Sequence, residues 1–97
     1  VEYYDEELDW EIGCDVGIHT YPSIADTRQQ KVSAEDMLKV TQETVFQLVR
    51  DDKFAIALGG EHSITTGIVE AYRKAYPDEP FTVVQIDAHG DLRHEYE

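Results

Sequence analysis

Basic residues are scarce in this 97-residue chain, which has eight Lys and Arg against 21 Asp and Glu and a formal net charge of −13. Binding of nucleic acid depends on Lys and Arg that neutralise phosphates and release counterions, so the composition argues against a nucleic-acid partner. The same acidic excess argues against an anionic membrane surface. We therefore expect cations rather than anions as partners.

Long apolar runs and paired cysteines are also missing. No apolar stretch approaches the roughly 20 residues that span a bilayer, so we expect no transmembrane segment. The opening residues are acidic where a secretory signal would be basic and then apolar. Cys14, the single cysteine, allows no internal disulfide and suits a reducing compartment. The 41% hydrophobic and 30% charged residues are typical of a globular chain, which we expect to be cytoplasmic.

The remaining pattern predicts strands alternating with helices. Period-two alternation indicates a strand over 11–18, a short apolar run before Gly59 indicates another over 54–58, and β-branched residues indicate a third over 81–86. One helix is predicted from Ser33 to its end at residues 51–53, and a second from about His62 to Tyr76. Such alternation is typical of an α/β fold with a parallel sheet.

Each predicted helix has one apolar face. The first helix opens with Ser33 followed by Asp36, the spacing of a capping box with Asp in place of Glu or Gln. Its stripe comprises Leu38, Thr41, Val45, Leu48 and Val49, and the inner face of the second comprises Ile64, Ile68, Ala71, Tyr72 and Ala75. The segment through Asp9 is interpreted as a solvated lead-in and residues 19–32 as a loop.

Two polar clusters follow predicted strands directly, at 59–62 and at 87–91. The carboxyl ends of parallel strands lie on one side of a sheet, where open α/β sheets bind ligands, so we expect the clusters to meet. Three parallel strands cannot bury both faces and both edges of a sheet. We therefore expect these residues to be part of a larger domain.

The second cluster, Asp87-x-His89-x-Asp91, combines two carboxylates and an imidazole within five residues. Mixed carboxylate and imidazole ligands suit Mn²⁺, Fe²⁺ or Zn²⁺ better than Ca²⁺. The alternative is a polar loop that merely ends a strand. His62, in the first cluster, is a candidate metal ligand, and the alternative interpretation is a helix-capping residue. Glu61 is interpreted in a similar way, as an acid in the first turn of the helix that complements the positive end of the helix dipole.

The two clusters resemble the first signature motifs of the ureohydrolases, the family of arginases, agmatinases and formiminoglutamases. The resemblance is carried by Leu58-Gly59-Gly60-Glu61-His62-Ser63-Ile64-Thr65 and by Gln85-Ile86-Asp87-Ala88-His89-Gly90-Asp91-Leu92-Arg93. It covers nearly the whole chain and is greatest for the agmatinase branch. It implies a three-layer α/β/α fold, of which residues 1–97 form the N-terminal part of a single domain.

The resemblance also implies a centre of two Mn²⁺ ions. Asp87 corresponds to a carboxylate that bridges both ions, His62 and Asp91 to ligands of one ion, and His89 to a ligand of the other. The implied reaction is hydrolysis of a guanidinium group with release of urea, as in the conversion of agmatine to putrescine. Asp91 would orient the attacking hydroxide and relay its proton.

Further ligands of this family, in a later Asp-x-Asp pair, are not in this chain. We therefore expect residues 1–97 alone to bind metal weakly and to be inactive, and the full-length protein to be a homo-oligomer with a small cationic guanidino substrate. The alternatives are an arginase, formiminoglutamase or guanidinobutyrase, or a truncated, non-catalytic metal-binding module.

Overall fold

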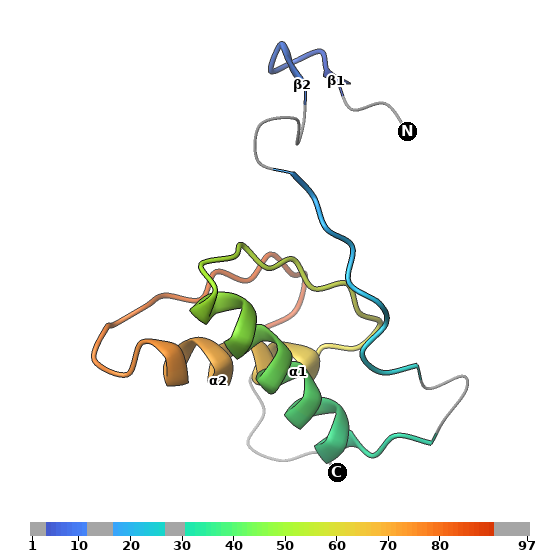
Figure 1. Cartoon of the computed structure of the whole chain (residues 1–97), viewed down its shortest axis with the longest axis vertical. Coiled ribbons are helices and arrows are strands. Elements are labelled where there is room, and N and C mark those ends of the chain that lie inside the picture. The colour runs from blue at the N-terminus through green and yellow to red at the C-terminus, as the bar shows by residue number, and fades with distance from the viewer. Residues whose placement is uncertain (1–3, 12–16, 27–30, 91–97) are drawn as a thin grey trace.

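The computed structural model describes residues 4–11, 17–26 and 31–90. In these ranges the chain forms a short hairpin and two helices: β1 (Tyr4–Asp5), β2 (Trp10–Glu11), α1 (Ala34–Arg50) and α2 (Ile64–Ala75) (Figure 1). The two helices pack against each other, while the hairpin lies apart from them at the top of Figure 1. No helix among the described residues is long and apolar enough to cross a membrane.

Helix α1 begins as its sequence predicts. The Ser33 hydroxyl accepts a hydrogen bond from the Asp36 amide at 3.0 Å, which satisfies one of the unpaired N–H groups of the first turn. The carboxylate of Asp36 in turn accepts from the Ser33 hydroxyl at 2.7 Å. The two side chains therefore fix the start of the helix together, and the predicted pairing of Ser33 with Asp36 is confirmed.

Helix α1 ends in a Schellman motif. The Asp52 amide donates to the Val49 carbonyl at 3.1 Å, and the Lys53 amide donates to the Leu48 carbonyl at 2.9 Å. This motif needs a left-handed residue at the position of Asp52, whose φ is 56°. Aspartate tolerates that conformation better than most residues do, although glycine is preferred.

Helix α2 begins two residues later than predicted, because a tight turn comes first. The amides of Thr65 and Thr66 donate to the carbonyls of His62 and Ser63, both at 3.0 Å, in the i to i+3 pattern of a 3₁₀ turn. His62 therefore lies just before the helix rather than in it. At the other end, the Tyr76 amide closes the helix on Tyr72, and Pro77 follows.

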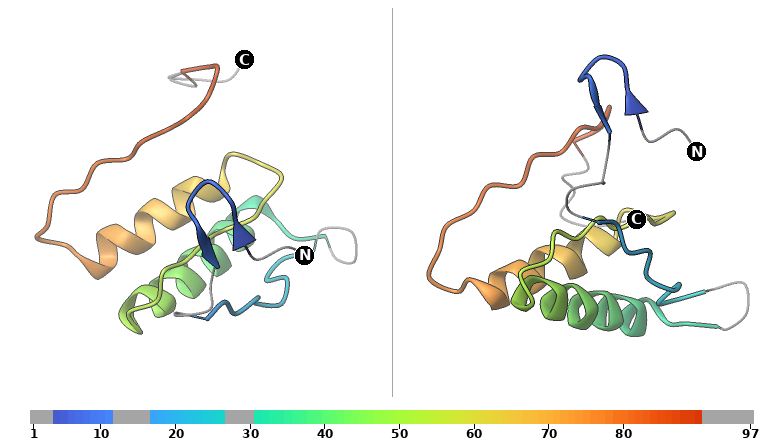
Figure 2. Two further views of the ribbon diagram at one scale, coloured as in Figure 1. Left: turned by 90° about the horizontal axis from the view of Figure 1, so that it is seen from above. Right: turned by 45° about the horizontal axis from the view of Figure 1, so that its top comes forward.

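The core lies where α1 crosses α2, as the side-by-side helices in Figure 2 show. Its buried members are Val45, Val49 and Ala71, with Phe46, Ile68, Tyr72 and Ala75 packed against them. Gly67 is buried at the crossing: a Cβ there would lie 2.9 Å from the Leu38 carbonyl oxygen and 3.2 Å from the Thr41 Cβ. The predicted stripes on both helices are thus confirmed, with Gly67 as the point of closest approach.

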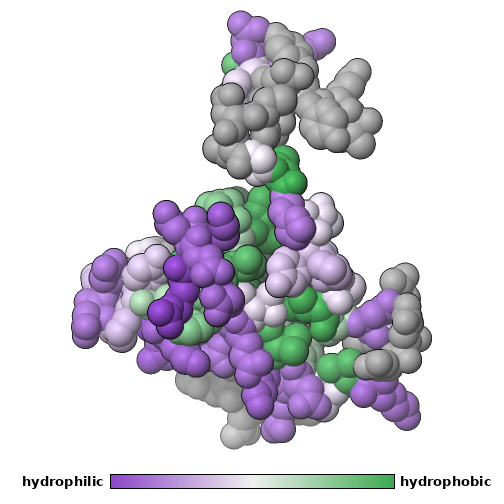
Figure 3. All heavy atoms as spheres, in the orientation of Figure 1, coloured by the Kyte–Doolittle hydropathy of each residue, from purple (hydrophilic) through white to green (hydrophobic). Residues whose placement is uncertain are grey.

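Two of the predicted strands are not strands in the structure. Residues 54–58 and 81–86 have no regular secondary structure and run as elongated coil (Figure 2). Their apolar side chains are largely exposed, with Leu58 at 95% and Ile86 at 99%, and apolar surface is visible as green areas in Figure 3. A strand requires a neighbour to take its hydrogen bonds and cover its faces. Neither segment has such a neighbour within the described residues, so the predicted sheet does not form there.

The N-terminal segment also differs from its prediction. Residues 4–11 form an antiparallel hairpin in which Tyr4 pairs with Glu11 and Asp5 with Trp10, whereas the segment through Asp9 is interpreted above as a solvated lead-in. The Asp5 carboxylate accepts from the amides of Glu7 and Leu8 at 2.9 and 3.0 Å, which fixes the turn. Hydrophobic periodicity could not indicate this hairpin, because polar turn chemistry defines it. Most of the predicted strand over 11–18 lies outside the described residues.

Candidate metal centre

The candidate site is centred on the carboxylate of Asp87, which lies between two imidazoles. Its Oδ2 atom is 3.7 Å from Nδ1 of His62, and its Oδ1 atom is 3.6 Å from Nδ1 of His89. His62 comes from the turn before α2, whereas the other two residues follow the coil of 81–86. The structure therefore brings the two polar clusters together, although no sheet joins them within the described residues.

The Asp87 carboxylate is held in place by its neighbours. Oδ1 accepts from the His89 backbone amide at 2.9 Å, and Oδ2 accepts from the Gln85 side-chain amide at 3.1 Å. The hydrogen bond from the His89 backbone amide is the main reason why the pKa of Asp87 lies below its ordinary value. The hydrogen bond from Gln85 and the charge of His62 make smaller contributions. Only 18% of the Asp87 side chain is exposed, against 74% for His62 and 82% for His89. At neutral pH the site thus presents an ionised carboxylate with two open imidazoles beside it.

Glu61, next to His62, has a capping role. Its Oε2 atom accepts from the Ser63 backbone amide at 3.2 Å and from the Ser63 hydroxyl. The hydrogen bond from the Ser63 hydroxyl is the main cause of the lowered pKa of Glu61, followed by the hydrogen bond from the Ser63 backbone amide. Glu61 precedes the N-cap Ser63, so it is not the acid in the first turn of the helix that the alternative interpretation describes, and the first turn of α2 has no acidic residue.

The donor atoms of Asp87 and the two histidines form two pairs, each with a spacing that one divalent ion could join. Metal bonds to nitrogen and oxygen are about 2.0–2.2 Å long, so donor atoms 3.6–3.7 Å apart can contact one ion between them. Each carboxylate oxygen has its own imidazole. Among the described residues, no three His, Cys, Asp or Glu side chains form a group that could hold a metal ion. The donors are arranged as two pairs that share Asp87.

Asp91, the fourth predicted ligand and the predicted catalytic residue, lies outside the described residues, as does Cys14. The metal roles of His62, Asp87 and His89 stay predictions. One residue of the site was missed: Gln85, which was assigned to a predicted strand and to the second motif but was given no role at the site. Its signal is its position two residues before Asp87, since such spacing puts two side chains on the same side of an elongated backbone.

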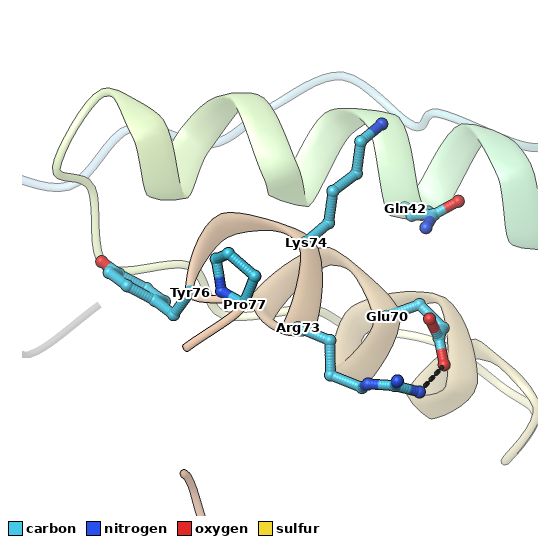
Figure 4. Close-up of a pocket in the computed structure, with 6 residues that line it drawn as sticks. All are labelled: Gln42, Glu70, Arg73, Lys74, Tyr76 and Pro77. Carbon is cyan, nitrogen blue, oxygen red and sulfur yellow. Dashed lines mark hydrogen bonds and ion pairs between the residues drawn. The ribbon is translucent and has the colours of Figure 1, made fainter. Parts of the chain in front are cut away.

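A shallow depression of about 350 Å³ lies at the opposite end of α2 from His62 (Figure 4). It is lined by Gln42, Glu70, Arg73, Lys74, Tyr76 and Pro77. Arg73 is paired with Glu70 at 3.1 Å, and the Lys74 ammonium lies 4.7 Å from the centre of the Phe46 ring. These cations are engaged by neighbouring side chains, so the depression offers no convergent set of groups for catalysis.

Comparison with known proteins finds relatives over most of the chain. The sequence model of the Arginase family matches residues 2–97. An N(1)-aminopropylagmatine ureohydrolase from Synechocystis is 46% identical over an alignment that covers all of this chain and 32% of the relative. An agmatinase from Halalkalibacterium halodurans is 36% identical, with 84% of this chain and 32% of the relative covered. An arginase from Saccharomyces cerevisiae is 39% identical over 56% of this chain and 16% of the relative.

No solved structure matches the chain significantly. The chain spans about a third of the length of the first two of these relatives. The match over nearly every residue shows that the chain belongs to the Arginase family, whose members have an α/β fold. Within that family the relatives reported above are named as an N(1)-aminopropylagmatine ureohydrolase, an agmatinase and an arginase.

Proposed function

We propose that the full-length protein is a guanidino hydrolase that uses two Mn²⁺ ions and releases urea from agmatine or from N(1)-aminopropylagmatine. The observation that carries this proposal is the division of the Asp87 carboxylate between two imidazoles, one facing each oxygen. Agmatine is the substrate that the sequence motifs favour. The second substrate is included because the relative that aligns with the whole chain is named for it.

In this proposal His62, Asp87 and Asp91 would hold one ion, and His89 would hold the other together with Asp87. Two ions at this place would supply a strong nucleophile at neutral pH by lowering the pKa of water. The protein's own contribution is to keep Asp87 ionised and oriented through the His89 amide and Gln85. The remaining ligands, by resemblance, belong to the later Asp-x-Asp pair.

The substrate is a cation, and the net charge of −13 gives the chain a field that attracts cations. We propose a cytoplasmic homo-oligomer for the full-length protein, without a nucleic-acid or membrane partner. Size-exclusion chromatography with light scattering tests the oligomer, since a monomeric mass would contradict it.

The test is urea release by the full-length protein supplied with Mn²⁺. We expect urea from agmatine or N(1)-aminopropylagmatine, and less from arginine. Asp87→Asn should reduce the rate by about 100-fold or more, since even outer partners of metal ligands cost 10–100-fold. Asp78→Asn makes the same change on an exposed turn after α2 and should leave the rate unchanged.

Three outcomes would contradict the proposal. Urea released best from arginine would indicate an arginase. Urea from none of the three compounds, with Mn²⁺ bound, would favour the non-catalytic metal-binding module. Equal losses in Asp87→Asn and Asp78→Asn would show that the Asp87 carboxylate has no specific role.

A further inference from the structure

We propose that Gln85 is a positioning residue that orients the Asp87 carboxylate for the metal pair, a role that rests on the proposed function. The Gln85 Nε2 atom lies 3.1 Å from Asp87 Oδ2, the same oxygen that faces His62. The amide nitrogen must be the group at this distance, because the amide oxygen and the carboxylate are both acceptors. Gln85 therefore donates to an atom of the candidate centre itself.

The hydrogen bonds of the carboxylate account for its orientation. An ionised carboxylate has about four lone-pair directions, two on each oxygen. On Oδ1 one direction is taken by the His89 amide, and on Oδ2 one is taken by Gln85. An imidazole Nδ1 lies 3.7 Å from Oδ2 and another lies 3.6 Å from Oδ1. The two donors thus hold the carboxylate between His62 and His89.

The two donors differ in how firmly they hold the carboxylate. The His89 amide belongs to the backbone two residues along the chain, so it fixes Oδ1 by the local turn. Without Gln85, one hydrogen bond fewer resists rotation of the carboxylate about its Cβ–Cγ bond, and Oδ2 loses the donor that holds it beside His62. Loss of Gln85 should therefore lower the binding affinity of the ion beside His62 more than that of the ion beside His89.

The test uses the full-length protein and Mn²⁺ alone as the probe. Gln85→Met keeps the length of the side chain and removes its donor. Free Mn²⁺ in a titration is measured by electron paramagnetic resonance. We expect the affinity for one of the two bound ions to fall by about 10-fold or more. Gln85→Leu provides a second variant without a donor.

The matched control is Gln47→Met. Gln47 also donates to a carboxylate at 3.1 Å, that of Asp51, but on the exposed face of α1. We expect this variant to keep the Mn²⁺ affinity of the wild type. Thermal unfolding of the metal-free proteins separates the roles, because a merely structural Gln85 would lower the melting temperature and leave Mn²⁺ affinity unchanged.

The outcomes distinguish this inference from the proposed function. If wild type binds two Mn²⁺ and releases urea while Gln85→Met and Gln85→Leu bind both ions equally well, the role of Gln85 is wrong and the proposed function stands. If wild type binds no Mn²⁺, both are wrong. A selective loss of one ion in the Gln85 variants, absent in Gln47→Met, supports the positioning role.

Discussion

Replacement of Gly67 by alanine tests the packing that holds α2, and hence the turn of His62, against α1. In an open helix, Gly→Ala stabilises by about 0.5–1 kcal/mol because alanine loses less backbone entropy on folding. At Gly67 the new Cβ would lie 2.9 Å from the Leu38 carbonyl oxygen and 3.2–3.3 Å from two carbon atoms of Thr41. The first neighbour is backbone, so it can give way only if the helices separate.

The steric cost should exceed the gain in propensity. Overpacking of a close contact typically costs about 1–3 kcal/mol. The main clash here is with a backbone atom, so we place the cost in the upper half of that range. The net expectation for Gly67→Ala is a loss of about 1–2.5 kcal/mol, and Gly67→Val should lose more because its methyl groups extend further into α1.

Urea unfolding of the full-length protein, followed by circular dichroism, measures this difference. Thr66→Ala is the control, since residue 66 is exposed on the same turn of α2 and alanine should be neutral or slightly stabilising there. Greater stability of Gly67→Ala, by the 0.5–1 kcal/mol of an open helix, would refute the close crossing of the two helices.

Three further predictions concern helix ends. Asp52→Gly should stabilise by about 0.5–1 kcal/mol in urea unfolding, because φ is 56° at residue 52, whereas Asp51→Gly, at φ −85°, should not stabilise. Ser33→Ala should cost about 1 kcal/mol by loss of the α1 cap, and more than Ser63→Ala, since the Ser63 hydroxyl makes no cap bond to its own helix. Ser63→Ala should raise the pKa of Glu61 toward its ordinary value, measured by NMR titration of the carboxyl carbon. Because folding lowers the pKa of Glu61, the ionised carboxylate stabilises the fold at pH values above the ordinary glutamate pKa. This stabilisation is lost as the pH falls through the pKa of the folded state. An unchanged titration of Glu61 in Ser63→Ala would contradict the hydrogen bond between the two side chains.

The helices could be predicted from the sequence because their signals are local. Ser33 and Asp36 cap α1 through neighbouring atoms, and the stripe from Thr41 to Val49 follows the helical period. Gly67 was missed because glycine is usually read as a weak helix residue. Its position within the apolar face of α2, three residues after Ile64, was the available signal for a close crossing.

The strands could not be settled in the same way, because a strand depends on residues distant in sequence. Residues 54–58 and 81–86 have apolar composition typical of buried strands, yet no neighbour pairs with them in the part of the chain that the structure describes. The meeting of His62 with Asp87 was predicted from a parallel sheet, and the two side chains meet although residues 54–58 and 81–86 form no strand. Gln85 illustrates the limit of motif reasoning, since its contact is visible only once the side chains are placed.

The arrangement of metal around Asp87 is tested most directly by a crystal structure of the Mn²⁺-loaded full-length protein, with anomalous scattering measured at the manganese edge. We expect two peaks that share the Asp87 carboxylate, one between Oδ2 and His62 and the other between Oδ1 and His89. A single peak, or manganese that does not contact Asp87, would contradict it.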